Sequence, residues 1–186
     1  VLHGMNTDAP SYVVAFEAAT GTAMWRVERP TDARNESPDA YTTPAVLRTA
    51  EGAQIVIAGG DYVTGHDPDT GGEIWRVGGL NPGKEGNFRI VGSPIAVGGM
   101  VYAQTRKKPL LAFSVGDDGR VDQDDLAWRW EGPGAPDVPT AACDGKYFFM
   151  SRRPRPRHRT RRPHRRGFVG TGAHGAGHGQ RLTGGS

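Results

Sequence analysis

Cysteine is nearly absent from this chain of 186 residues, and long apolar runs are absent altogether. The single cysteine, Cys143, cannot close a disulfide within the chain, and no Cys/His cluster in residues 1–150 has the spacing of zinc ligands. No run of about 18 apolar residues occurs, so no segment is expected to cross a membrane as a helix. Packing and hydrogen bonds must therefore hold the fold together.

Acidic residues are missing from the end of the chain. Residues 151–186 contain ten arginines and no Asp or Glu, whereas residues 1–150 contain 13 Lys or Arg against 20 Asp or Glu, a net charge of −7. The tail also has few apolar residues, so it cannot bury enough surface to offset the entropy of ordering. We predict that residues 151–186 form a disordered basic tail.

A helical period of apolar residues is also lacking. The 28 glycines and 14 prolines divide the chain into short apolar runs rich in Val, Ile, Tyr and Phe. Runs of this length between Gly, Pro, Asp and Thr are typical of β-strands. The connections are too short for crossover helices, so neighbouring strands are expected to pair antiparallel.

What the sequence does contain is an internal repeat with a step of fifty residues. The segment YVVAFEAATGTAMWRV at residues 12–27 aligns without a gap with YVTGHDPDTGGEIWRV at residues 62–77. A Ser/Thr-Pro marker at Pro44 and Pro94 keeps the same step, and VPTAAC at Pro139 is a third copy. In the best-preserved unit, four strands are predicted at residues 42–47, 54–58, 61–66 and 73–77.

Each unit is predicted to be a small antiparallel meander with two apolar faces. Such a sheet cannot bury both faces alone, so the units are expected to stack face to face like the blades of a β-propeller. The predicted fold class is all-β, with about three four-stranded blades. Residues 1–150 are divided into a blade end at 10–28, blades at 42–78 and 91–131, and a blade start at 138–150.

Two tryptophans, Trp25 and Trp75, stand at the same distance after a Thr-Gly turn in successive units. An indole between two blades removes a large apolar area from water and can donate its N–H to the neighbouring blade. The alternative is that each indole fills the core of its own blade. Recurrence at a fixed position favours the role between blades.

The segment from Val14 to Trp25 (Ala-Phe-Glu-x-x-Thr-Gly-x-x-x-Trp), its weaker copy at residues 65–75, and the Ser93-Pro94 start of the next unit resemble the repeats of PQQ-like β-propellers. This family includes quinoprotein alcohol dehydrogenases and the outer-membrane assembly lipoproteins of the BamB type. Its members close rings of seven or eight blades, so the resemblance implies that the chain is a fragment of such a ring.

The dehydrogenases of this family share an adjacent cysteine pair, a calcium-binding Glu/Asn/Asp set and a catalytic aspartate around the quinone. The chain has no motif onto which these residues can be carried, so no catalytic, cofactor-binding or metal-binding residue is predicted. PQQ and calcium are expected only if the chain is a dehydrogenase fragment, and whether the parent is an enzyme stays open, with a non-catalytic role favoured.

Three charged segments are candidates for ion-binding sites. Asp67, Asp69 and Glu73 offer oxygen ligands on one tight loop, but they lack the downstream glutamate of an EF-hand, so a reversing turn is favoured. An inserted loop holds a denser acidic cluster, interpreted as solvated, at Asp117, Asp118, Asp122, Asp124 and Asp125. Arg106, Lys107 and Lys108 are interpreted as a polar sheet edge rather than an anion site.

Cys143 and His66 are the other candidates for chemistry. Cys143 precedes an Asp-Gly turn and has no histidine nearby in the sequence, which favours a packed or edge thiol over a nucleophile. His66 falls within a predicted strand, where a hydrogen-bonded structural histidine is the default. Acid–base catalysis would need two titrating groups to converge from separate blades.

The tail allows two interpretations. Arginines broken by prolines at residues 151–166 are typical of an arm that binds nucleic acid. The same composition is typical of GC-rich DNA read out of frame, and back-translation read one nucleotide later can give Ala-Leu-Asp-Ala-Arg-Thr-Gly, a tryptophan and Ser-Pro, which is the repeat again. Out-of-frame translation is favoured, and it predicts an inserted or missing base near the codon of Met150.

The leading functional prediction is a non-catalytic propeller scaffold that binds a protein or a small ligand. By resemblance alone it is expected in the periplasm or otherwise outside the cytoplasm of a bacterium. The alternatives are a fragment of a PQQ-dependent dehydrogenase and, less favoured, nucleic-acid binding through the basic tail. Exposed blade edges are expected to promote association.

Overall fold

The structure, a computed structural model, describes residues 2–4, 10–105, 107–116, 118–121, 126–132, 135–151 and 169–172. All regular elements in these residues are β-strands. The strands are β1 (Leu2–Gly4), β2 (Tyr12–Phe16), β3 (Ala23–Glu28), β4 (Ala45–Thr49), β5 (Gly52–Gly59), β6 (Tyr62–His66), β7 (Glu73–Val77), β8 (Ile95–Val97), β9 (Met100–Ala103), β10 (Leu110–Ser114), β11 (Leu126–Trp130), β12 (Ala142–Cys143), β13 (Tyr147–Met150) and β14 (Val169–Gly172).

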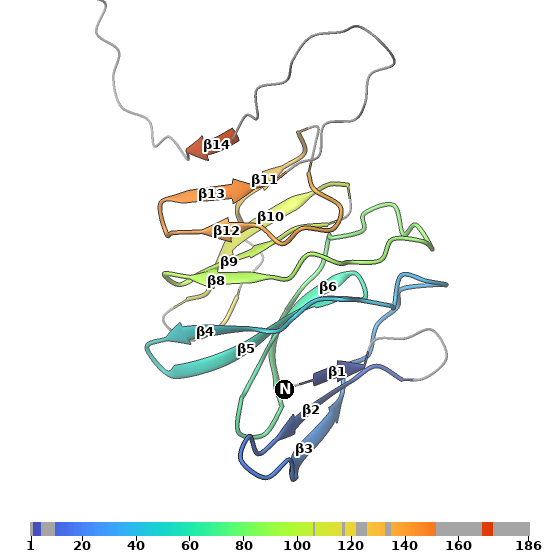
Figure 1. The fold of residues 1–186 in the computed structure, drawn as a ribbon, viewed down its shortest axis with the longest axis vertical. Helices are drawn as coiled ribbons and strands as arrows, with labels where there is room; N and C mark the ends of the chain where they lie inside the picture. Colours follow the sequence, from blue (N-terminus) through green and yellow to red (C-terminus); the bar gives the residue numbers. More distant parts are fainter. Residues whose placement is uncertain are drawn as a thin grey trace, which may run out of the picture.

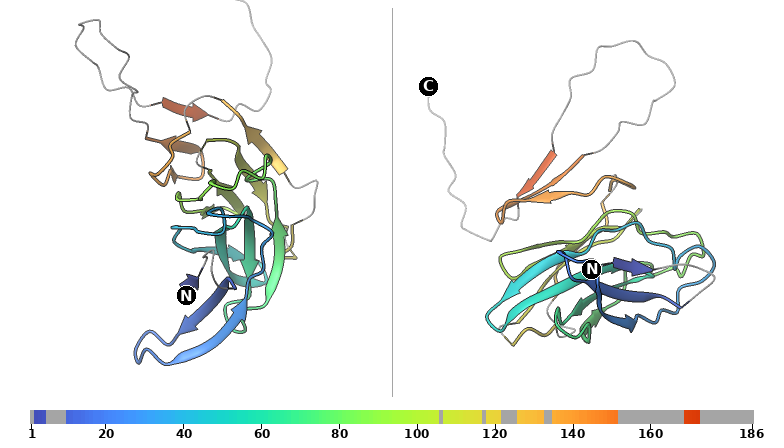
Figure 2. Two further views of the ribbon diagram at one scale, coloured as in Figure 1. Left: turned by 90° about the vertical axis from the view of Figure 1, so that its right-hand side faces the viewer. Right: turned by 60° about the horizontal axis from the view of Figure 1, so that its bottom comes forward.

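The strands form four antiparallel sheets in chain order: sheet 1 (β1–β3), sheet 2 (β4–β7), sheet 3 (β8–β11) and sheet 4 (β12–β14). Strands that follow one another in the sequence are neighbours in each sheet, so every sheet is a meander. The sheets succeed one another along the long axis of the molecule (Figure 1), and the left-hand view of Figure 2 shows the same succession. The predicted all-β partial propeller is confirmed.

The predicted elements differ from the structure in detail. Sheet 1 gains β1, which was not predicted, and β4 begins three residues later than the expected start at Thr42. Thr42 lies outside the strand and contacts β5 through its side chain, because its hydroxyl donates to the carbonyl of Ala58 at 2.6 Å.

A strand also lies within the predicted disordered tail, because Val169–Gly172 pairs with β13 along its whole length. Strand pairing uses backbone groups, so a glycine-rich segment can complete an open sheet edge without apolar side chains. The expectation of disorder therefore does not hold for residues 169–172. The remaining calls on the tail fall outside the described residues.

The starts of successive sheets are joined by a chain of hydrogen bonds between equivalent residues. The backbone N–H of Thr43 donates to Ser93 Oγ at 2.8 Å, and the backbone N–H of Ser93 donates to Thr140 Oγ1 at 3.0 Å. Each of these residues lies two positions before the first strand of its sheet. The repeated Ser/Thr marker of the sequence is thus a connector between sheets.

The largest core cluster lies between sheets 2 and 3. Val56 and Val63 of sheet 2 and Val101 of sheet 3 are fully buried in it, and Phe113 is 1% exposed. Burial of such side chains stabilises by about 1.5–3 kcal/mol each. A second, smaller cluster lies between sheets 3 and 4 around Leu110 and Phe148. Each core cluster is therefore formed where two neighbouring sheets pack against each other.

Three tryptophans occupy one repeated register position. Trp25 pairs with Ala15, Trp75 with Gly65 and Trp128 with Ala112, and the register shifts directly after each pair. The third tryptophan, Trp128, lies in β11, within the predicted blade at residues 91–131. The fifty-residue repeat of the sequence thus corresponds to a repeated strand register in the structure.

Trp25 bridges sheets 1 and 2 as predicted. Its indole N–H donates to the carbonyl of Pro68 in the β6–β7 turn at 2.9 Å. Its ring also lies 2.5 Å from the position that a Cβ on Gly71 would take, and Gly71 has φ +78°. Glycine is required there both by the backbone conformation and by the neighbouring indole.

Trp75 departs from the prediction in one respect. Its ring meets Phe113 of sheet 3 edge-on, with centroids 5.6 Å apart, but its N–H donates to Gln54 of its own sheet at 2.7 Å. Gln54 in turn donates to the carbonyl of Gly119, in the connection between β10 and β11 of sheet 3. The hydrogen bond within sheet 2 is possible because Gly65 has no Cβ, so the Trp75 indole packs directly on its own sheet. At the corresponding position opposite Trp25, Ala15 has a Cβ.

We predict that Gly71→Ala destabilises the protein more than Gly21→Ala. Both glycines have positive φ at the same turn position, so both substitutions should cost about 1 kcal/mol of backbone strain. A Cβ at position 71 also overlaps Trp25, which should add about 1–3 kcal/mol. The free energy of unfolding, from urea denaturation of both variants, checks this.

Gly21 is the matched control because nothing lies within 4 Å of a Cβ built on it. Equal destabilisation by the two substitutions would show that Trp25 does not pack on the neighbouring sheet.

Candidate binding surface

Two long connections between sheets form one preorganised surface. They are residues 29–44, between β3 and β4, and residues 78–94, between β7 and β8. The N–H of Glu36 donates to the carbonyl of Gly86 at 2.8 Å, and the N–H of Tyr41 donates to the carbonyl of Ile90 at 3.0 Å. The two connections therefore hold each other by backbone hydrogen bonds, in addition to being tethered at their ends.

A buried serine fixes the two connections side by side. Ser37 is fully buried; its hydroxyl donates to the carbonyl of Glu85 at 2.6 Å and accepts the N–H of Phe88 at 3.0 Å. Buried polar groups that are satisfied in this way give a segment a single conformation. The two connections therefore have a defined conformation in the absence of a binding partner.

The β5–β6 turn is bound to the second connection through Asn81. The Asn81 amide donates to Asp61 Oδ1 at 3.1 Å and to the carbonyl of Glu85 at 3.0 Å, and its carbonyl oxygen accepts the N–H of Glu85. Asp61 is 3% exposed, and burial raises the pKa of its carboxyl, while Asn81 opposes this by hydrogen bonding. Lys84 Nζ lies 3.7 Å from Asp61 Oδ2.

The rim beside this turn carries a cluster of paired charges. Lys84 Nζ lies 2.8 Å from Asp32 Oδ1, and the Tyr62 hydroxyl donates to the same oxygen at 2.9 Å. The hydrogen bond to Lys84 lowers the pKa of Asp32, and the hydrogen bond to Asp32 raises the pKa of Tyr62. All three groups therefore keep their ordinary protonation states at neutral pH, which suits recognition rather than proton transfer.

Exposed anchor residues lie on the same surface. Tyr41 is 61% exposed, and Arg89 reaches its hydroxyl while forming an ion pair with Glu36. Tyrosine and arginine are the residues that most often dominate the energy of protein interfaces. A shallow cleft of about 220 Å³ opens further along, between the second connection and the β9–β10 loop, lined by Asn81, Pro82, Gly83, Glu85, Phe88, Lys107, Lys108, Pro109, Arg129 and Glu131.

Beneath the surface, Arg29 fills the space between sheets 1 and 2. Its side chain is fully buried and donates to Thr64 Oγ1 at 2.7 Å and to the carbonyls of Gly59 and Tyr62. Burial, together with the nearby Arg76, lowers the pKa of Arg29 to about 9. The guanidinium remains protonated at pH 7 and ties the first connection to sheet 2.

His66 completes this buried network. Its Nδ1 lies 3.0 Å from the carbonyl of Gly71 and its Nε2 lies 2.9 Å from Thr64 Oγ1. A carbonyl only accepts, so Nδ1 carries the proton and Nε2 of the neutral ring accepts from the Thr64 hydroxyl. Burial lowers the pKa of His66. The interpretation of His66 as a structural histidine fits this geometry.

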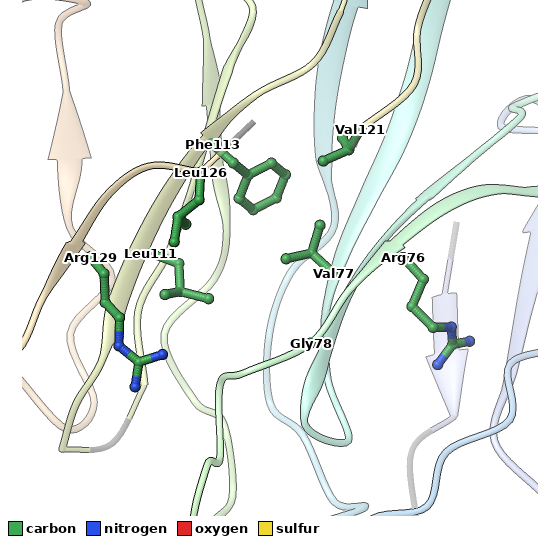
Figure 3. Close-up of a pocket in the computed structure, with 8 residues that line it drawn as sticks. All are labelled: Arg76, Val77, Gly78, Leu111, Phe113, Val121, Leu126 and Arg129. Carbon is green, nitrogen blue, oxygen red and sulfur yellow. The ribbon is translucent and has the colours of Figure 1, made fainter. Parts of the chain in front are cut away.

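A larger pocket of about 350 Å³ lies between sheets 2 and 3. Figure 3 shows Phe113, Leu111 and Leu126 on one side of it and Val77 and Val121 on the other. Arg76, Gly78 and Arg129 complete its lining. The pocket was not predicted, because its walls come from three separated segments of the chain.

The charged segments weighed from the sequence have structural partners. Asp67 Oδ1 accepts hydrogen bonds from the N–H of Asp69 and from both the N–H and the hydroxyl of Thr70, as in a reversing turn. These bonds lower the pKa of Asp67. Lys107 forms an ion pair with Glu85 at 2.8 Å.

The inserted acidic loop is described only in part. Asp118 accepts the N–H of Arg120 at 3.0 Å, while Arg106, Asp117, Asp122, Asp124 and Asp125 lie outside the described residues. Cys143 is half-buried and lies against Tyr102, whose pKa is raised by burial and by this thiol. Over the described part of the chain, no three His, Cys, Asp or Glu side chains gather as metal ligands, and no helix could cross a membrane.

Sequence reasoning missed Arg29, Ser37 and Asn81. Arg29 stands in a segment whose copy fifty residues later has Gly79, and this break in the repeat was the one available signal. Ser37 and Asn81 lie in connections without any repeat pattern, so their burial could only come from the three-dimensional structure.

The fold and its repeated register define a β-propeller of the PQQ-like repeat class, as the resemblance implied. The profile of the family described as outer membrane protein assembly factor BamB matches residues 9–152, and the chain therefore belongs to this family. No curated protein matches the chain.

Among solved structures, the chain is similar to BamB from Moraxella catarrhalis, with 18% sequence identity and a TM-score of 0.51. The similarity covers 76% of this chain and 40% of that chain. At this identity it shows the fold alone, and the present chain spans less than half of the length of its structural relative.

The buried histidine predicts a loss of stability in mild acid. The pKa of His66 lies below its ordinary value of 6.5, so between the two values the unfolded state binds more protons than the folded state. The free energy of unfolding should fall as the pH drops below about 6.5 and should gain nothing from this group above it.

Urea denaturation at several pH values between 5 and 8 measures this dependence. His66→Gln should be less stable overall by about 1–3 kcal/mol, since it breaks buried hydrogen bonds, and its stability should depend less on pH in this range. An unchanged pH dependence in that variant would assign the effect to other groups.

Proposed function

We propose that the chain is part of a non-catalytic propeller scaffold that binds a protein partner in outer-membrane protein assembly. The observation that carries the proposal is the preorganised surface made by residues 29–44 and 78–94. Because backbone bonds and the buried Ser37 fix its shape, binding would cost little ordering entropy. The family match supports this cellular process and an extracytoplasmic location.

The chemistry of the surface supports recognition of a protein. Tyr41 is exposed at its edge beside the partly exposed Arg89, while the charges of Asp32 and Lys84 neutralise each other. An aromatic and arginine anchor with a polar rim is typical of protein interfaces. The most buried titratable groups, Arg29 and His66, are held by structural hydrogen bonds, so they support no acid–base step.

The alternative of a quinone-dependent dehydrogenase fragment has its own test. We expect no saturable change in tryptophan fluorescence when PQQ and Ca²⁺ are added to the chain. The same titration with the longer parent protein should give neither a bound quinone spectrum nor dye-linked alcohol oxidation. A saturable quinone spectrum with alcohol oxidation would replace the scaffold proposal with an enzymatic one.

Binding to purified outer-membrane assembly proteins, titrated one at a time by biolayer interferometry, tests the scaffold proposal. Tyr41→Ala and Arg89→Ala should each weaken binding about tenfold, because each removes an anchor of the surface. Met24→Ala, at an exposed apolar position on β3, should change the affinity less than about twofold.

Absence of binding to every component would contradict the proposed function. Equal weakening by Met24→Ala and Tyr41→Ala would retain a binding role but move it away from the connecting segments.

A further inference from the structure

The pocket between sheets 2 and 3 lies where the preceding interface is filled by a side chain of this protein. Arg29 is the fourth residue after Trp25, and Gly79 is the fourth residue after Trp75. The repeat thus replaces a fully buried arginine by a glycine. The interface between sheets 2 and 3 therefore lacks a counterpart of the large Arg29 side chain that fills the interface between sheets 1 and 2.

The strand register identifies the residues that face this position in each interface. Thr64 pairs with Arg76 and His66 with Glu73 in sheet 2. In sheet 3, Leu111 pairs with Arg129 and Phe113 with Leu126. Leu111, Phe113 and Leu126 therefore replace Thr64, His66 and Glu73 at the equivalent positions.

These replacements change the chemistry of the interface as a set. Thr64 accepts a hydrogen bond from Arg29, and Glu73 lies close enough to oppose the lowering of the Arg29 pKa. In the interface between sheets 2 and 3, which has no equivalent of Arg29, the positions of these polar residues are all occupied by apolar ones. The corresponding space between sheets 2 and 3 has mainly apolar walls, and among the residues that the structure describes no larger side chain fills it.

The resulting pocket has the properties of a ligand site. Its volume of about 350 Å³ lies within the range of small-molecule sites, and its lining combines leucine, valine and phenylalanine side chains with two arginines. Arg129 lies beside Leu111 at one side of the pocket (Figure 3). The Nε–H of Arg129 donates to Glu131 Oε1 at 2.6 Å. Because a guanidinium has five N–H donors, Arg129 can also bind a second carboxylate.

We propose that this pocket binds a small monocarboxylate with an aromatic or branched aliphatic body. The apolar body enters between Leu111 and Val77, and the carboxylate remains at Arg129 near the surface. This pocket shares Gly78 with the second connection and Arg129 with the neighbouring cleft, but it contains neither Tyr41 nor Arg89, and the proposal does not depend on the proposed function.

Titration of the full chain with 4-phenylbutyrate, followed by methyl NMR, tests the proposal. The methyl signals of Val77, Leu111, Val121 and Leu126 should shift saturably, and so should the indole signal of Trp75, which contacts Phe113. The uncharged amide of the same compound should bind in the same place, but more weakly.

Two variants separate the apolar and charged contributions. Arg129→Gln should weaken binding of 4-phenylbutyrate about fivefold and leave the amide within about twofold. Leu126→Trp, at a position that is 42% exposed on the pocket wall, should weaken both ligands at least about fivefold by filling space. The matched controls Arg48→Gln and Met24→Trp, at exposed positions away from the pocket lining, should leave both affinities unchanged.

Shifts confined to residues of sheets 1 and 4 would overturn the proposal, because they would show binding to the apolar surfaces of the outermost sheets. An affinity unaffected by Leu126→Trp would also overturn it. If that variant fails to fold, equal loss of carboxylate and amide binding in Arg129→Gln would reject the assigned orientation.

Discussion

The contact of each sheet with the next is the interaction on which this structure depends. An isolated meander of short strands buries little and leaves two apolar faces in water. Sheets 2 and 3 remove those faces together, because Trp75 and Phe113 meet edge-on within one continuous core. The connecting surface depends on the same stacking, since its two long segments leave adjacent sheets and reach each other only when those sheets are packed.

The first two interfaces between sheets have the same arrangement of strands but opposite chemistry. Between sheets 1 and 2, Arg29 is buried in a hydrogen-bonded network with Thr64. Between sheets 2 and 3, Leu111 and Phe113 surround a pocket. A repeat protein can make this change because each interface is formed largely by its own pair of units. Local exchange of a few residues can therefore create a site without altering the remaining blades.

Much of the fold could be predicted from the sequence, because the fifty-residue repeat carries both the strand periodicity and the turn glycines. The inter-sheet position of Trp25 followed from the same pattern. The hydrogen bond of Trp75 did not, because its direction depends on whether residue 65 has a Cβ, which the repeat does not determine. The candidate surface was not predicted, since Ser37 and Asn81 lie in connections whose partners are distant in sequence.

Native-state hydrogen exchange tests the central claim most directly, by comparing slowly exchanging amides of β5 and β6 with those of β9 and β10. If the sheets are stable only through each other, both groups should open with the same free energy and respond equally to denaturant. Opening free energies that differ by more than about 1 kcal/mol, with one sheet retained while the other unfolds, would contradict this account.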